Sequence, residues 1–388
     1  MSIEVKRKNP MITLVLVYAA YYSTSIILKP GAYVTEKIVL VSMTITSLVF
    51  GLFLVMRKSQ KKSWWINSEP PSNKRISFWS LIGHIFSFIL YITNGIPIFS
   101  SDIQSSRLEI FSNGWISTLA TVPLTISIIL SGLQSINLKR IKSIKFFFQF
   151  ISPLLILFSF GNRFLWFFPV IFLLSHRYFF GNFSFRKNVT SLGFSLIAVT
   201  LVGLFRDLLS WGDASDNLKR IGVDSLLERL IYPIKIYVEG SSVAMDNVFM
   251  NYSDPNNREG AEVLFSAFLS PLPGIQLNAS QVLKESLGYR FVGEGLAMGT
   301  PAGLYMCFGF FVVFLWYVLM GATIGKLWDK SGQSSRTRSV FAYFFTFCAL
   351  GVWMDPLSNL SLVLIPVGLF FSFKEIEGSK NANVIQRC

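Results

Sequence analysis

Hydrophobic runs of membrane-spanning length alternate with short polar gaps along the chain. The runs cover residues 11–28, 37–56, 76–93, 115–135, 145–160, 163–180, 189–206, 302–325, 339–354 and 357–373. A helix that crosses a bilayer needs about 20 mostly apolar residues. The pattern therefore predicts an all-α polytopic membrane protein with about ten transmembrane helices. Only Gly161-Asn162 separates runs five and six, so a re-entrant hairpin is the alternative there.

Basic residues fall in every second gap between these runs. They occupy the segment before run one, the gaps after runs two, four, six and eight, and the tail after run ten. Because Lys and Arg concentrate in cytoplasmic loops, these gaps and both termini are predicted to be cytoplasmic. The other gaps face the opposite side, and the largest of them runs from Asp207 to Thr300.

The chain accordingly divides into three parts. Residues 1–206 form helices 1–7, residues 207–300 form a large periplasmic or extracellular loop between helices 7 and 8, and residues 301–388 form helices 8–10 with a cytoplasmic tail. Within the loop, residues 224–238 carry Leu and Ile at near-helical spacing, and residues 261–272 are apolar. We expect two or three short amphipathic helices at the membrane surface. A folded cap without a catalytic role is the alternative.

Composition supports a membrane location. Of 388 residues, 52% are hydrophobic and 14% are charged, whereas soluble domains are roughly 45–50% apolar and about 25% charged. The net charge of +14 does not indicate a nucleic-acid partner, because the basic residues lie in short loops beside apolar runs. The expected partner is the lipid bilayer. No cluster has metal-ligand spacing and no phosphate-cradling GxxxxGK[ST] loop is present, so we expect no metal, no other cofactor and no ATP-driven work.

Four arginines on the predicted outward face are candidate ligands for a lipid diphosphate: Arg107, Arg163, Arg206 and Arg290. A guanidinium presents a planar fork that binds phosphate oxygens in pairs. An arginine at the end of a span also commonly reaches lipid headgroups without a further role. Arg163 fits this headgroup-binding alternative least well, because it lies in a tight hairpin with no length of helix along which its side chain could extend to the headgroups.

Two further groups could carry chemistry. Glu294 lies between Gly293 and Gly295, which allow close backbone approach, and it could accept a proton if partly desolvated. His84 lies in the middle of the third run. An ionisable group at that depth is a functional candidate, and a neutral histidine bonded to a neighbouring helix is the alternative.

Three stretches resemble the Wzy-type O-antigen or capsule polymerases, the oligosaccharide repeat unit polymerases of bacterial membranes. They are Gly95-Ile96-Pro97 running to Ser106-Arg107-Leu108-Glu109, Gly161-Asn162-Arg163, and Gly293-Glu294-Gly295 leading to Gly303-Leu304-Tyr305. The resemblance covers most of the chain in architecture and about forty residues in motif. Many relatives have an acid two positions before that tyrosine, where this chain has Gly303. Either Glu294 replaces that acid or the acid is not essential.

The resemblance implies a GT-C-like membrane glycosyltransferase in the bacterial cytoplasmic membrane. Such an enzyme would move a growing glycan from undecaprenyl diphosphate to a sugar hydroxyl of a new lipid-linked repeat unit, at the outer face. It implies Glu294 and Arg163 as catalytic residues, and Arg107, Arg206, Arg290 and Tyr305 as substrate-binding residues. It also implies a separate chain-length regulator as a partner.

Two other functions fit the same general plan. An O-antigen ligase would, by resemblance, use a histidine in the large external loop, and residues 207–300 contain none. A flippase for lipid-linked oligosaccharides would usually show two similar halves, and no internal repeat is evident. The sequence therefore favours the polymerase.

Overall fold

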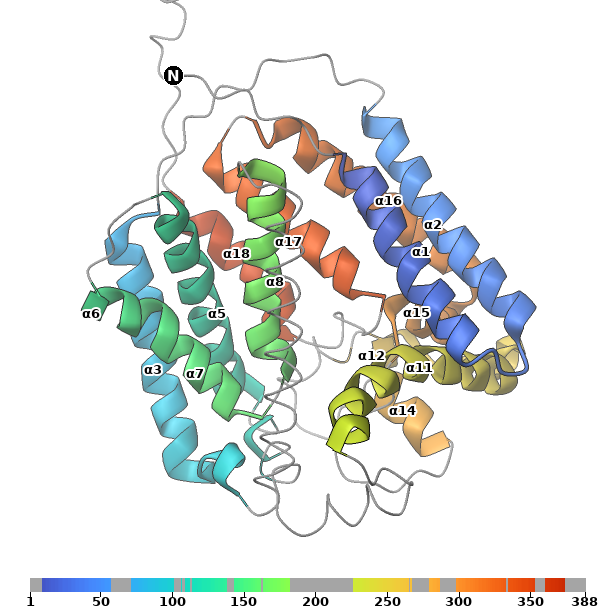
Figure 1. The fold of residues 1–388 in the computed structure, drawn as a ribbon, viewed down its shortest axis with the longest axis horizontal. Helices are drawn as coiled ribbons and strands as arrows, with labels where there is room; N and C mark the ends of the chain where they lie inside the picture. The colour runs from blue at the N-terminus through green and yellow to red at the C-terminus, as the bar shows by residue number, and fades with distance from the viewer. Residues whose placement is uncertain are drawn as a thin grey trace, which may run out of the picture.

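The structure is a computed structural model. It describes residues 9–56, 71–100, 106, 109–111, 114–137, 143–161, 163–181, 226–264, 266, 279–286, 298–332, 334–352 and 360–373. Within these residues every regular element is a helix (Figure 1). The helices of the hydrophobic runs are α1 (Pro10–Leu28), α2 (Val34–Met56), α3 (Asn73–Asn94), α5 (Gly114–Asn137), α6 (Ser143–Phe146), η2 (Phe147–Ile151), α7 (Ser152–Ser159), α8 (Arg163–Phe180), α15 (Thr300–Phe308), α16 (Phe310–Lys330), α17 (Ser335–Leu350) and α18 (Leu360–Ser372). The remaining elements are η1 (Pro97–Phe99), α11 (Leu226–Tyr252), η3 (Pro255–Asn257), α12 (Ala261–Leu264) and α14 (Ala279–Ser286).

Among the described residues, five helices are long and apolar enough to cross a membrane: α1, α2, α3, α5 and α16. Shorter apolar helices cover residues 144–159, 165–180 and 363–372. The prediction of an all-helical chain with membrane-spanning helices is confirmed to this extent. The predicted seventh span, 189–206, lies outside the described residues, so the count of ten stays a prediction.

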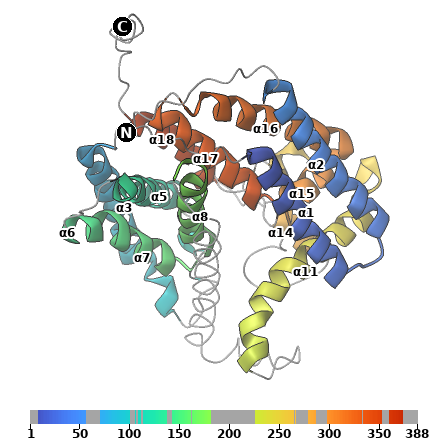
Figure 2. The same ribbon diagram turned by 45° about the horizontal axis from the view of Figure 1, so that its top comes forward.

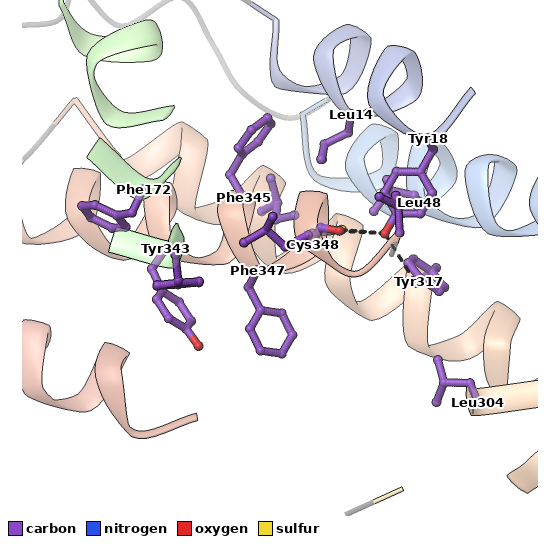
Figure 3. Packing of buried hydrophobic residues seen from close by; sticks show 14 of the residues in the cluster. Leu14, Tyr18, Leu48, Phe172, Leu304, Tyr317, Tyr343, Phe345, Phe347 and Cys348 are labelled. Atoms are coloured by element: carbon purple, nitrogen blue, oxygen red, sulfur yellow. Dashed lines mark hydrogen bonds between the residues drawn. The ribbon is translucent and has the colours of Figure 1, made fainter. Parts of the chain in front are cut away.

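The helices form two packed groups that meet along α8, α17 and α18 (Figure 1). One group contains α1, α2 and α16, and the other contains α3, α5 and α7. Each has a hydrophobic cluster: the larger includes Tyr18 and Phe341, and the smaller includes Leu124 and Phe160. Within the larger cluster, the Tyr18 hydroxyl donates to the Cys348 carbonyl at 2.8 Å and lies 3.4 Å from the Tyr317 hydroxyl (Figure 3).

Helices α2 and α16 pack with their backbones in close contact. A Cβ atom added at Gly51 would collide with the Val318 carbonyl oxygen, and one added at Gly321 would collide with the Leu48 carbonyl oxygen. Gly321 and Gly325 form a GxxxG pattern on this face of α16. Lipid tails are as apolar as leucine side chains, so such helices associate through close van der Waals contact of small residues.

The second group is joined by polar contacts along one face of α3. The partners, from one end of α3 to the other, are Asn73 with Gln134, Ser77 with Gln149, Ser80 with the Phe148 carbonyl, His84 with Ser152, and Tyr91 with Ser159. The π-helix η2 interrupts regular backbone bonding, and hydroxyl groups of neighbouring helices satisfy its carbonyls. Such contacts fix helix register in lipid.

His84 is part of this polar face. Its Nδ1 lies 2.7 Å from the Ser80 carbonyl oxygen, which can only accept, so Nδ1 carries the proton. Its Nε2 lies 2.7 Å from Ser152 Oγ. His84 is therefore hydrogen-bonded to the neighbouring helix α7.

The two ends of the bundle make different contacts. At the basic end, where α3 and α17 begin, Arg75 and Arg336 donate to the Phe371 and Phe373 carbonyls at the C-terminus of α18. Cations there complement the negative end of the helix dipole. At the opposite end, called the loop end here, the α1–α2 turn contacts α11.

We predict that Gly321→Ala destabilises the protein. The new methyl group must push α2 and α16 apart, and such overpacking costs about 1–3 kcal/mol. Thermal unfolding in detergent should show a clearly lower Tm. The control is Leu319→Ala on the same helix, because Leu319 is 63% exposed on the outer surface and its truncation should change Tm little. Equal Tm values for the two variants would contradict the close-packing interpretation.

Candidate functional site

The structure describes only part of the predicted site. Arg107, Arg206, Arg290 and Glu294 lie outside the described residues. Arg163 is the first residue of α8, and only its backbone is described. Tyr305 lies in α15, where its side chain is buried with 5% exposure. Tyr305 is therefore the predicted residue whose surroundings can be examined.

Helix α11 packs across the loop ends of α1 and α2 (Figure 1). It runs from Leu226 to Tyr252 and so continues well beyond the predicted segment 224–238. Its second half buries Ala244, Met245 and Val248, because it packs against α1, α2 and α15. Figure 2 shows this half beside α15 and the end of α1. The sequence Gly240-Ser241-Ser242 has low helix propensity. Packing against α1, α2 and α15 therefore stabilises this part of α11.

A buried ion pair attaches α11 to the turn between α1 and α2. Lys37 Nζ lies 2.7 Å from Asp246 Oδ2 and donates to the Pro30 carbonyl and Ser242 Oγ, each at 2.8 Å. Lys37 has no exposed surface. Its charge is thus fully compensated, as burial of an ammonium group requires.

Aromatic rings connect this turn to Tyr305. The ring of Phe249 in α11 lies 6.2 Å from that of Tyr33 and 4.8 Å from that of Tyr305. Tyr305 in turn lies 4.7 Å from Phe310, the first residue of α16. Tyr305 therefore continues the line of aromatic contacts from the α1–α2 turn to the start of α16.

The predicted eighth span, 302–325, is two helices rather than one. α15 ends and α16 begins at Gly309, whose φ of +76° is accessible mainly to glycine. The break leaves C-terminal carbonyls of α15 open to other donors. Glu259 N donates to the Met306 carbonyl at 3.3 Å, and Arg258 Nη1 donates to the Phe308 carbonyl at 3.4 Å. The α11–α12 connection thus caps α15.

Arg258 lies directly on this helix junction. A Cβ atom added at Gly309 would lie 2.6 Å from the guanidinium carbon of Arg258. Arg258 Nε is buried and has no hydrogen-bond partner among the described residues. The first N–H groups of α16 begin at the same glycine, and a helix N-terminus attracts negative charge. The Arg258 guanidinium therefore lies between the C-terminal carbonyls of α15 and the first N–H groups of α16.

A carboxylate adjoins this guanidinium. The Tyr252 hydroxyl donates to Glu259 Oε1 at 3.3 Å. Burial raises the pKa of Tyr252 above its ordinary value, with a smaller contribution from the Glu259 charge, so the phenol stays a donor at neutral pH. Arg258 can bind an anion, and Glu259 can accept a proton from a neighbouring hydroxyl.

Sequence reasoning missed Arg258 and Glu259. The available signal was the run Arg258-Glu259-Gly260, which has the same combination of base, acid and glycine as Arg290 with Glu294 and Gly295. What made Arg258 stand out is its contact with Gly309, fifty-one positions later, and spacing within the loop does not reveal it. Among the described residues, no group of three or more His, Cys, Asp and Glu side chains could hold a metal ion.

We predict that Gly309→Ala is more damaging than Gly95→Ala. Both glycines have φ near +75°, so alanine at either position introduces backbone strain of about 1–3 kcal/mol. Around Gly95 a Cβ atom would meet nothing within 4 Å, whereas at Gly309 it must displace the Arg258 guanidinium. Unfolding measurements should therefore give a lower Tm for Gly309→Ala. A matching loss in the two variants would argue against a tight Arg258–Gly309 contact.

Comparison with known proteins leaves the family open. No protein-family model, curated protein or solved structure matches this chain. The arrangement of Arg258, Glu259 and Tyr305 at the helix junction is therefore the basis for assigning a function.

Proposed function

We propose that the chain is a membrane glycosyltransferase that polymerises undecaprenyl-diphosphate-linked oligosaccharide repeat units into surface polysaccharide, as its resemblance to the Wzy-type polymerases implies. The reaction takes place at the outer face of the bacterial cytoplasmic membrane. The donor and acceptor are both lipid-linked glycans, and the loop end of the bundle is the outward end.

One observation carries this proposal: Arg258 lies at the junction of α15 and α16 with a buried, unpartnered Nε among the described residues. This junction is at the N-terminus of α16, which is long and apolar enough to cross a membrane. The end of such a helix is at headgroup level, where the diphosphate of an isoprenoid lipid must lie. A guanidinium and a helix N-terminus at that depth suit a diphosphate.

The chemistry requires a leaving group, a nucleophile and a base. The acceptor sugar hydroxyl attacks the anomeric carbon of the donor glycan, a new C–O bond forms, and the C–O bond to the diphosphate breaks. Arg258 and Arg163 stabilise the negative charge that develops on the departing lipid diphosphate. A carboxylate, Glu294 or Glu259, accepts the proton of the attacking hydroxyl. Tyr305 offers an apolar ring beside the junction.

A gene deletion tests the reaction class. Surface polysaccharide separated on a gel should show single repeat units in place of a ladder when the gene is absent, because repeat units are still exported but not joined. Full-length chains retained on undecaprenyl carrier would instead indicate a ligase. Loss of all external glycan would indicate a flippase. Either of the last two patterns would overturn the proposal.

We predict that Arg258→Ala and Arg163→Ala each abolish chain extension while the protein is still expressed. Loss of one donor to developing charge costs about 10²–10³-fold in rate. Arg163→Lys should also largely fail, because lysine lacks the planar fork. The readout is ladder length after complementation of the deletion strain.

Arg75→Ala is the matched control for these variants. Arg75 belongs to the basic end, where it donates to the Phe371 carbonyl, so its loss should leave the ladder intact. A normal ladder from Arg258→Ala would remove Arg258 from the site.

A further inference from the structure

Lys37 and Asp246 make hydrogen bonds beyond those needed to neutralise each other's charge. All three ammonium protons of Lys37 have acceptors, namely Asp246 Oδ2, the Pro30 carbonyl and Ser242 Oγ. Ser242 Oγ in turn donates to the Lys29 carbonyl at 2.5 Å. Replacing a buried ion pair with apolar side chains is often neutral or stabilising. The pair therefore contributes more by fixing α11 against the α1–α2 turn than by raising the free energy of unfolding.

The α1–α2 turn is built around the Asp246 carboxylate. Tyr33 N donates to Asp246 Oδ1 at 3.1 Å. Gly31 has φ +65°, and a Cβ atom there would overlap the Asp246 side chain. Both carboxylate oxygens are thus bonded, and the backbone closes against them. α11 can rotate or slide only if this turn opens.

Two connections lead from the pair to the helix junction. Phe249, less than one helical turn after Asp246, packs between Tyr33 and Tyr305. Tyr252, about two turns after Asp246, bonds to Glu259, and Glu259 N bonds to the Met306 carbonyl. Arg258 is the neighbour of Glu259 and covers Gly309. A displacement of α11 would therefore move Arg258 relative to α15 and α16.

We propose that Lys37 and Asp246 are positioning residues, which hold α11 in the one register that places the Arg258 guanidinium on the α15–α16 junction. This inference rests on the proposed function, because the geometry matters for transfer only if Arg258 binds the lipid diphosphate. The pair itself does not touch substrate. It acts on the reaction through α11 and the side chains of Phe249 and Tyr252.

The decisive variant is the double substitution Lys37→Met with Asp246→Leu. It removes both charges together and leaves neither buried alone, so the full-length protein should lose less Tm in detergent than Lys37→Met alone, although Tyr33 N and the Pro30 carbonyl lose their partners. Spin labels at Ile38→Cys and Met250→Cys report the position of α11 against α2, since these side chains are 51% and 66% exposed. The distance distribution should be narrow in the parent protein and broad or shifted in the double variant.

Polymer formation in the deletion strain is the second readout. The double variant should lose roughly a hundredfold in polymer yield although it stays folded, because a displacement of about 1 Å at a reacting group costs about that much. Gly31→Ala displaces the same carboxylate from the turn side and should give the same two results, even if the double variant fails to fold. The matched control is Glu285→Gln, an exposed acid of α14, which should change neither readout.

The outcomes separate the two proposals. Two results in a folded double variant, or in Gly31→Ala, would overturn the positioning role while leaving the polymerase function intact. The first is an unchanged distance between the spin labels. The second is a normal polymer yield together with a broadened distance. A parent protein that restores no polymer to the deletion strain would overturn the proposed function. The label distances would still measure whether the pair holds α11.

Discussion

A buried ion pair joins the segment before α15 to the first helical hairpin, and the arrangement at the loop end depends on it. Lys37 and Asp246 are 209 positions apart in the chain. An uncompensated ammonium group at this depth would be expensive, so the α1–α2 turn and α11 must meet in the native structure. Once they meet, Phe249 contacts Tyr305, and the α11–α12 connection reaches the carbonyls that the break at Gly309 exposes.

The bundle itself is held by contacts suited to a lipid environment. An apolar side chain is buried about equally well against lipid and against another helix. Glycines and hydroxyl groups therefore decide which helix faces pack together. Gly321 and Gly51 allow α16 to touch α2 along the backbone. Serine and histidine side chains along α3 set its register against η2 and α7. Large apolar side chains such as Phe88 and Leu319 remain on the outer surface, where lipid would cover them.

The sequence predicts that arginines form the candidate site, but it does not predict which arginine lies at the helix junction. The expectation of arginines at the outward face led to Arg107, Arg206 and Arg290, which lie outside the described residues, and to Arg163, of which only the backbone is described. The resemblance points to Tyr305, which lies beside Phe249 and Phe310. Arg258 itself was missed, because its importance comes from a contact with a glycine in another helix, and local spacing carries no information about such contacts.

The sequence by itself determined the helical class and most helix positions, because the length of a hydrophobic run is a local property. Only the tertiary structure decided three other features: the extension of α11 to Tyr252, the break of the eighth run at Gly309, and the partner of Lys37. Each depends on a surface contributed by a distant segment. α11 needs α1 and α15 to bury its apolar face, and Gly309 needs the Arg258 guanidinium to fill the space that a side chain would occupy.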